Sequence, residues 1–165
     1  MSGTIGRAVT NKVMERIMGP SGMNAGLAAL TQGEPGFAAL VDAAQVRAQN
    51  APAETAERSG VKYPCVNVYC QGIKNQLREK FRTFSGQAQM AIELRCSQDR
   101  LDGLQDQLSL YVDSTMAMLD AGRGDWGDGM FFGGEYEVSF GPVKQGGKNF
   151  IQMAKVTFEI GVSRN

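Results

Sequence analysis

Residues 97–122 have the sequence SQDRLDGLQDQLSLYVDSTMAMLDAG, and this stretch decides the fold that we predict for the chain. Its apolar residues recur at intervals of three and four, which predicts an α-helix with one apolar face. Ser97 is a suitable N-cap, and Gly122 is a suitable end of the helix. Stretches that alternate polar and apolar residues lie on both sides, so we expect a helix that packs across a β-sheet. The apolar face consists of Leu101, Leu104, Leu108, Tyr111, Val112, Met116 and Leu119.

The alternating stretches predict four strands, two before the helix and two after it. In the second of them, Glu93 and Arg95 belong to the face that we expect to be in water. Strands that follow one another in this order pair most simply as antiparallel neighbours. We therefore predict an α+β fold, in which an antiparallel, about four-stranded β-sheet packs on one long central α-helix, with an additional N-terminal helix. The four strands are expected at residues 61–71, 87–96, 135–140 and 150–162.

The first 60 residues differ in composition from the rest. Residues 4–18 predict a helix, because apolar residues recur every fourth position before Gly-Pro ends the run. Short helices are possible at 24–31 and 37–49, and residues 50–60 are typical of a solvated loop or linker. We predict an N-terminal helix and weakly structured segment at 1–60, followed by an α+β domain at 61–165. The few large apolar residues of 21–60 leave open whether that segment folds only on contact with a partner.

Composition excludes several classes of protein. The chain has 17 basic and 17 acidic residues, so no net charge draws it to nucleic acid or to an anionic membrane. No apolar run approaches the roughly 20 residues of a membrane-spanning helix, and we expect the protein to stay in the compartment where it is made. There is no histidine, and the three cysteines form no CxxC pair, so we expect reduced thiols, no metal and no cofactor.

We find no catalytic constellation in the sequence and expect no enzymatic activity. The segment GPVKQGGKN at 141–149 resembles a phosphate-binding loop, but Gly147 occupies the position that requires lysine, and Asn149 follows Lys148 where Ser or Thr is needed. A hairpin loop explains this segment better. Asp125, Asp128 and Glu135 lack the spacing of a calcium-binding loop, and we interpret them as solvated residues.

The remaining candidates are surface patches. Residues 74–82, KNQLREKFR, form either a helical turn or a long hairpin loop with concentrated positive charge, and a second basic pair lies in the loop that joins the last two strands. Such patches suit an acidic partner surface or a nucleic-acid backbone, although solvated loops also have this composition. The aromatic residues of the glycine-rich turn fit either an interface anchor or the core. The candidate interface residues are Lys74, Arg78, Lys80, Arg82, Trp126, Phe131, Phe132, Lys144 and Lys148.

The order of several segments resembles the tail terminator or tail-completion proteins of long-tailed bacteriophages. The segments are YPCVNVYCQGIKN, FSGQAQMAIELRCSQDR, a long helix containing LYVDS, GDWGDGMFFGGEYEVSF and GGKNFIQMAKVTFEIGVS. The resemblance covers about residues 61–165, and it carries over no individual functional residue, because the family has no fixed motif for one.

The resemblance implies a virion structural protein of the phage neck, assembled in the host cytoplasm. Such proteins form a ring, usually hexameric, that caps the tail tube, stops its polymerisation and provides the head-joining surface. The implied partners are further copies of the chain, the tail tube protein and a head-tail connector or stopper protein, with no membrane and with DNA at most as passing cargo. Three alternatives remain open: a nucleic-acid-binding α+β module that uses residues 74–82, a head-completion or stopper protein of the neck, and a small enzyme with an unfamiliar site.

Overall fold

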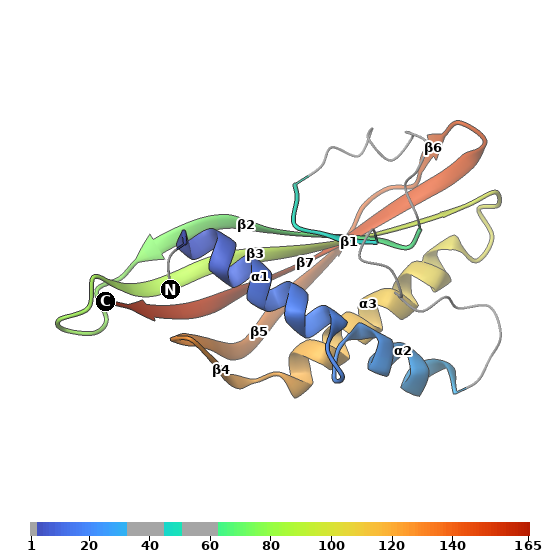
Figure 1. Cartoon of the computed structure of the whole chain (residues 1–165). Coiled ribbons are helices and arrows are strands. Elements are labelled where there is room, and N and C mark those ends of the chain that lie inside the picture. The colour runs from blue at the N-terminus through green and yellow to red at the C-terminus, as the bar shows by residue number, and fades with distance from the viewer. Residues whose placement is uncertain (1–2, 33–44, 51–62) are drawn as a thin grey trace.

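The computed structural model describes residues 3–32, 45–50 and 63–165 (Figure 1). Three helices and one sheet make up these residues, so the predicted α+β class is confirmed. The helices are α1 (Ile5–Met18), α2 (Met23–Thr31) and α3 (Leu104–Ala121). The strands are β1 (Val46–Arg47), β2 (Cys65–Asn75), β3 (Phe84–Gln98), β4 (Gly124–Gly127), β5 (Met130–Phe140), β6 (Lys144–Gly146) and β7 (Asn149–Arg164).

The sheet is larger and more mixed than the sequence predicts. Among the described residues its order is β1-β2-β3-β7-β5-β4, with β6 paired to β7, and the whole sheet is strongly curled into a half-barrel. Its long strands pair antiparallel, as expected, but β1 runs parallel to β2. The prediction missed the three short strands because two to four residues are too few to show an alternating pattern.

The central helix begins later than its apolar pattern suggests. Ser97 is not an N-cap, because it is still part of β3 and pairs with Ile151 of β7. Gly103 is the observed N-cap, and Gly122 ends the helix as predicted. Leu101 consequently lies outside the helix and is exposed. Pairing with the long strand β7 therefore extends β3 into the segment that has local helix-start signals.

The N-terminal helices pack on the same core as the sheet. In α1 the side chain of Thr4 accepts a hydrogen bond from the backbone N–H of Arg7, and the buried face includes Val9, Val13 and Ile17. The short helix expected at 24–31 is α2. Most of the helix expected at 37–49 lies outside the described residues, but its described end contains the strand β1 instead. The loop expected at 50–60 lies almost entirely outside the described residues, so the predicted boundary at residue 60 stays a prediction.

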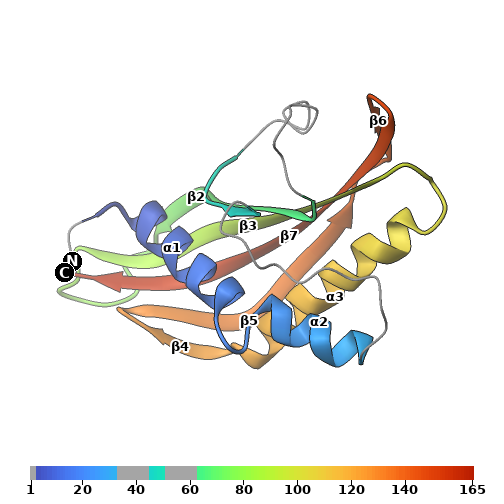
Figure 2. The same cartoon turned by 45° about the vertical axis from the view of Figure 1, so that its right-hand side comes forward.

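The two faces of the sheet differ in their covering. The helices lie along one face, as Figures 1 and 2 show from two directions. The inward residues predicted for 87–96 are all buried there. On the other face Glu93 and Arg95 are also buried, contrary to the prediction. Their charges are tolerated there because they are paired: the Tyr69 hydroxyl donates to Glu93 Oε1 at 2.6 Å, and Arg95 Nη2 donates to Glu93 Oε2 at 3.1 Å. None of the described helices is long and apolar enough to cross a membrane.

Candidate functional site

The most prominent surface feature is the hairpin that joins β2 to β3, whose residues 74–83 we call the arm. The ladder between the two strands ends at Asn75 and Gly86, and the ladder between β3 and β7 ends at Phe84 and Arg164. Residues 76–83 therefore extend past the last paired positions, at the end of the molecule where the N and C marks lie (Figure 1). Of the two structures that the sequence left open for this segment, the hairpin loop is the one observed.

Hydrogen bonds hold the base of the arm. Asn75 Oδ1 accepts from the backbone N–H groups of Leu77 at 3.2 Å and Ser85 at 3.1 Å, and Asn75 Nδ2 donates to the carbonyl of Thr83 at 3.2 Å. Ser85 Oγ accepts from the backbone N–H of Glu79 at 2.9 Å. Side-chain groups thus replace the ladder bonds where the two strands separate.

The arm is also fixed to the end of β7. The hydroxyl of Ser163 donates to Glu79 Oε2 at 2.9 Å, and Arg82 Nη1 donates to Asn165 Oδ1 at 2.9 Å. Within the arm, Arg82 Nε lies 3.4 Å from Glu79 Oε2. These contacts limit the conformations of the arm, although its residues 77–83 are exposed.

Two large apolar side chains are at the tip of the arm. Phe81 is 100% exposed and Leu77 is 69% exposed. Both have positive φ values, 66° and 50°, which are unfavourable for bulky residues. A bulky residue at a positive φ costs free energy, and such strained backbone positions are found preferentially at sites with a function.

The four predicted basic residues of the first patch lie together on the arm and are exposed. Arg82 is paired with Glu79, whereas Lys74 and Lys80 form no ion pair with another described residue. The second basic pair is elsewhere: Lys144 lies in β6 and Lys148 in the turn before β7, at the opposite end of β7 from the arm. The structure therefore brings together the first basic patch and keeps the second apart from it.

The aromatic candidates separate into core and surface. Trp126 is 6% exposed and Phe132 is 0% exposed, with their ring centroids 5.7 Å apart. Trp126 Nε1 donates to the carbonyl of Gly122 at 2.6 Å, and the Arg16 guanidinium lies 4.6 Å from the ring centroid. Of the two roles that the sequence left open, these residues have the core role. Phe131 alternates to the other face of β5 and is 55% exposed.

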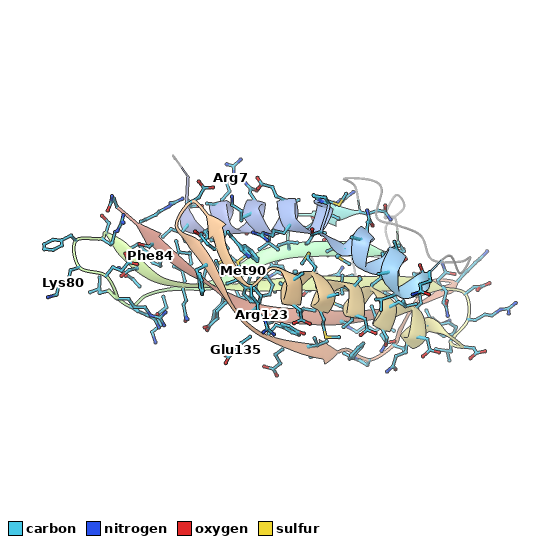
Figure 3. All side chains as sticks on the ribbon, turned by 90° about the horizontal axis from the view of Figure 1, so that it is seen from below. Arg7, Lys80, Phe84, Met90, Arg123 and Glu135 are labelled. Atoms are coloured by element: carbon cyan, nitrogen blue, oxygen red, sulfur yellow. The ribbon has the colours of Figure 1, made fainter. Side chains whose placement is uncertain are left out.

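The helix-free face of the sheet contains a groove of about 730 Å³ that the sequence analysis did not identify. Its carboxylates are Glu135 and Glu137 from β5 and Glu159 from β7, and all three are exposed. Figure 3 shows Glu135 pointing away from the sheet on the side opposite Arg7 of α1. The signal was present in the sequence, since these glutamates occupy the polar positions of alternating strands. The other lining residues are Gln71, Arg78, Gln87, Gln89, Met90, Phe131, Gly133, Tyr136, Thr157, Phe158 and Gly161.

A second hollow, of about 340 Å³, lies between the ends of α1 and α3 and is lined by Lys12, Arg16 and Trp126 among others. Its charged groups are already engaged, because Lys12 Nζ donates to Asp128 Oδ2 at 2.9 Å and Arg16 stacks on Trp126. This hollow therefore has fewer uncommitted groups for a ligand than the groove on the helix-free face.

The described cysteines and tyrosines show what burial does to their protonation. Burial raises the pKa of the Cys96 thiol to about 12 and also raises that of Cys65, so neither is a ready nucleophile. Burial and the hydrogen bond to Glu93 raise the pKa of Tyr69. Within the described ranges no three Cys, Asp or Glu side chains gather as metal ligands.

No protein-family model matches the chain, and no curated protein matches it either.

Proposed function

We propose that this chain is a structural protein of a long-tailed bacteriophage, a tail terminator that forms a ring on the finished tail tube. The ring, expected to be hexameric, stops tube polymerisation and provides the surface to which the head is joined. In this role the protein needs surfaces for other proteins and no enzymatic activity. The segment order of residues 61–165 motivates the proposal, and the arm is the structural observation that supports it.

The arm supports a protein-binding role because it combines order with exposed apolar area. Its base is fixed by Asn75, Ser85 and Ser163, while the Phe81 ring is fully exposed. A loop that is already ordered loses little conformational freedom on binding, so more of the interaction energy remains as affinity. Phe81 is flanked in the chain by Lys80 and Arg82, and aromatic and arginine residues are enriched in protein interfaces.

A ring also requires two different surfaces on each copy, because a head-to-tail contact joins unlike patches. The chain has two unlike patches, which meet at Arg78. The arm carries basic and apolar groups at one end of the sheet, and the groove carries exposed carboxylates on the helix-free face. Two unlike patches on each copy can supply the head-to-tail contact of a ring.

The proposal is tested by mass measurement and by tube binding. Light scattering and negative-stain images of the purified protein are expected to show a ring of several subunits, either free or on tail tubes. Adding the protein to polymerising tail tube protein should then shorten the tubes and leave rings at their ends. Protein that stays monomeric alone, and that neither binds nor shortens tubes, would overturn the proposal. Binding to the head connector in the absence of tube binding would favour a head-completion or stopper protein.

A nucleic-acid-binding module is the second candidate, because Lys74, Arg78, Lys80 and Arg82 all lie on the arm. Glu79 neutralises part of this charge through Arg82, and the carboxylates of the neighbouring groove would repel a phosphate backbone. This candidate predicts an affinity for DNA or RNA that falls steeply with salt and is lost in R78E/R82E. Titration of the protein into labelled duplex and single-stranded nucleic acid at two salt concentrations tests this candidate. An absence of binding at low salt would exclude it.

A further inference from the structure

We propose that the arm of one copy docks into the acidic groove of the neighbouring copy. The Phe81 ring would enter the groove, and the arm lysines would meet the groove carboxylates. This inference rests on the proposed function, since it supplies the head-to-tail contact that closes the ring. It identifies the partner of both surfaces as a second copy of this chain.

Charge is the first argument for this contact. Lys74 and Lys80 on the arm form no ion pair with another described residue, and the same holds for Glu135, Glu137 and Glu159 in the groove. Among the described residues, unpaired cations therefore lie on the arm and unpaired carboxylates in the groove, which Arg78 of the arm borders. Surfaces of opposite potential speed association and select the correct register of two proteins.

Shape and apolar surface are the second argument. The groove contains an exposed aromatic ring, Phe131, beside Gly133 and Gly161, which have no side chains. A Cβ atom built on Gly133 would meet no atom within 4 Å, so the space above this residue is open. An inserted Phe81 could stack against Phe131 there, and aromatic pairs add to the gain from apolar burial. The two most exposed phenylalanines of the described residues would thus cover each other.

Position is the third argument, because the arm does not fill its own groove. Arg78 borders the groove of the same chain, but Lys80 and Phe81 at the tip are not among the residues that line it. In Figure 3, Lys80 lies at the far end of the arm and Glu135 lies near the middle of the molecule. Each copy therefore presents an arm at one place and an open groove at another. Such a contact is repeated from copy to copy and can close into a ring.

The test is a charge reversal with rescue. The arm variant K74E/K80E and the groove variant E135K/E137K are each expected to raise the concentration needed for half-assembly by about 10-fold or more, because like charges then face each other. The variant that carries all four changes, and an equal mixture of the two double variants, should regain assembly. Sedimentation velocity and light scattering at low salt measure this, in solution and on tail tubes.

Two further variants make the result specific. The control R7E/R100E makes the same change of charge at two exposed positions outside the arm and the groove, and should assemble as the wild type does. Gly133→Leu fills the groove without changing charge, at a position where a side chain has room, and should weaken assembly. Circular dichroism and thermal unfolding check that each variant is folded.

The outcomes separate this inference from the function on which it rests. Rings that form normally from the arm and groove variants would overturn the arm-to-groove contact and leave the terminator proposal standing. Arm variants that form rings but no longer bind tubes would overturn it as well, and would make the tail tube the partner of the arm. Wild-type protein that forms no ring in solution or on tubes would overturn both proposals.

Discussion

Phe132 and Phe81 are the same kind of residue in opposite surroundings. Phe132 is 0% exposed and lies between Trp126 and Phe158, with ring centroids 5.7 Å from each. Phe81 is 100% exposed at the tip of the arm. Both residues follow polar or glycine-rich segments, so local composition does not distinguish them.

Register makes the difference between the two. Phe132 is paired with Ile160 of β7, and this pairing places its side chain on the face that the helices cover. Phe81 lies in the connection beyond the last pair of β2 and β3, where no element covers it. The buried aromatic corner, which we define as Trp126, Phe132 and Phe158, should therefore determine stability, while the arm should determine assembly. The following variants test this division.

Phe132→Ala should have the largest effect. It removes a fully buried ring that contacts two other rings, and we expect a loss of about 3–5 kcal/mol in the free energy of unfolding. Urea unfolding followed by tryptophan fluorescence measures this, since the only tryptophan is part of the same corner. A loss below about 1 kcal/mol would show that the corner does not control stability as described.

Gly86→Ala should have the next largest effect. A Cβ at this position would overlap the backbone oxygen of Lys74 and lie 2.9 Å from Cα of Asn75, so the two strands must separate at the base of the arm. We expect a loss of about 1–3 kcal/mol and faster hydrogen exchange in residues 76–83. Gly133→Ala is the matched control, because its Cβ would meet nothing within 4 Å. Equal stability of the two variants would contradict the close contact at Gly86.

Phe81→Ser should change stability by no more than about 0.5 kcal/mol, because its side chain has no contacts to lose. Its effect should instead appear in assembly, measured by the concentration at which rings form. Together with Phe132→Ala this variant separates the two roles. A clear loss of stability in Phe81→Ser would mean that the ring is covered in the free protein, against the structure.

Asp128→Asn should have the smallest effect, which should appear only as a change in how stability depends on pH. The hydrogen bond and charge of Lys12 lower the pKa of Asp128 in the folded protein. A carboxyl whose pKa is lower in the folded than in the unfolded protein stabilises the fold at pH values above its ordinary pKa. This stabilisation is lost as the pH falls through the lowered pKa. Asn fits the φ of 55° at this position. The midpoint temperature of thermal unfolding should therefore fall less steeply between pH 7 and pH 3 in the variant than in the wild type.

Much of the fold follows from local sequence patterns. The alternation from Ala88 to Cys96 predicts a strand with one buried face, and these positions are buried. The helix at α1 follows equally from its four-residue repeat and the Gly-Pro stop. These predictions succeed because each pattern matches the period of its element over several turns or pairs.

The predictions fail where a residue from another part of the chain determines the local structure. Ser97 has the composition of a helix start, but Ile151 pairs with it and extends the strand. Glu93 occupies a polar position, yet it is buried, and its carboxylate accepts hydrogen bonds from Tyr69 and Arg95 that no local pattern reveals. In the candidate site, the basic residues of the arm could be predicted as a patch. The acidic groove could not, because its lining requires β3 to lie beside β7, a pairing of distant strands that no local pattern reveals.

The contacts at the base of the arm also bear on how the protein should be labelled. Arg164 Nη1 donates to the carbonyl of Gly3 at 2.8 Å, and Arg82 of the arm donates to Asn165, so both ends of the described chain lie beside the arm. Figures 1 and 2 show the N and C marks close together there. An affinity tag or fluorescent protein fused to either end would crowd the arm. A fluorophore or epitope inserted at Gly147, an exposed turn residue with open space around it at the other end of β7, would leave the arm clear.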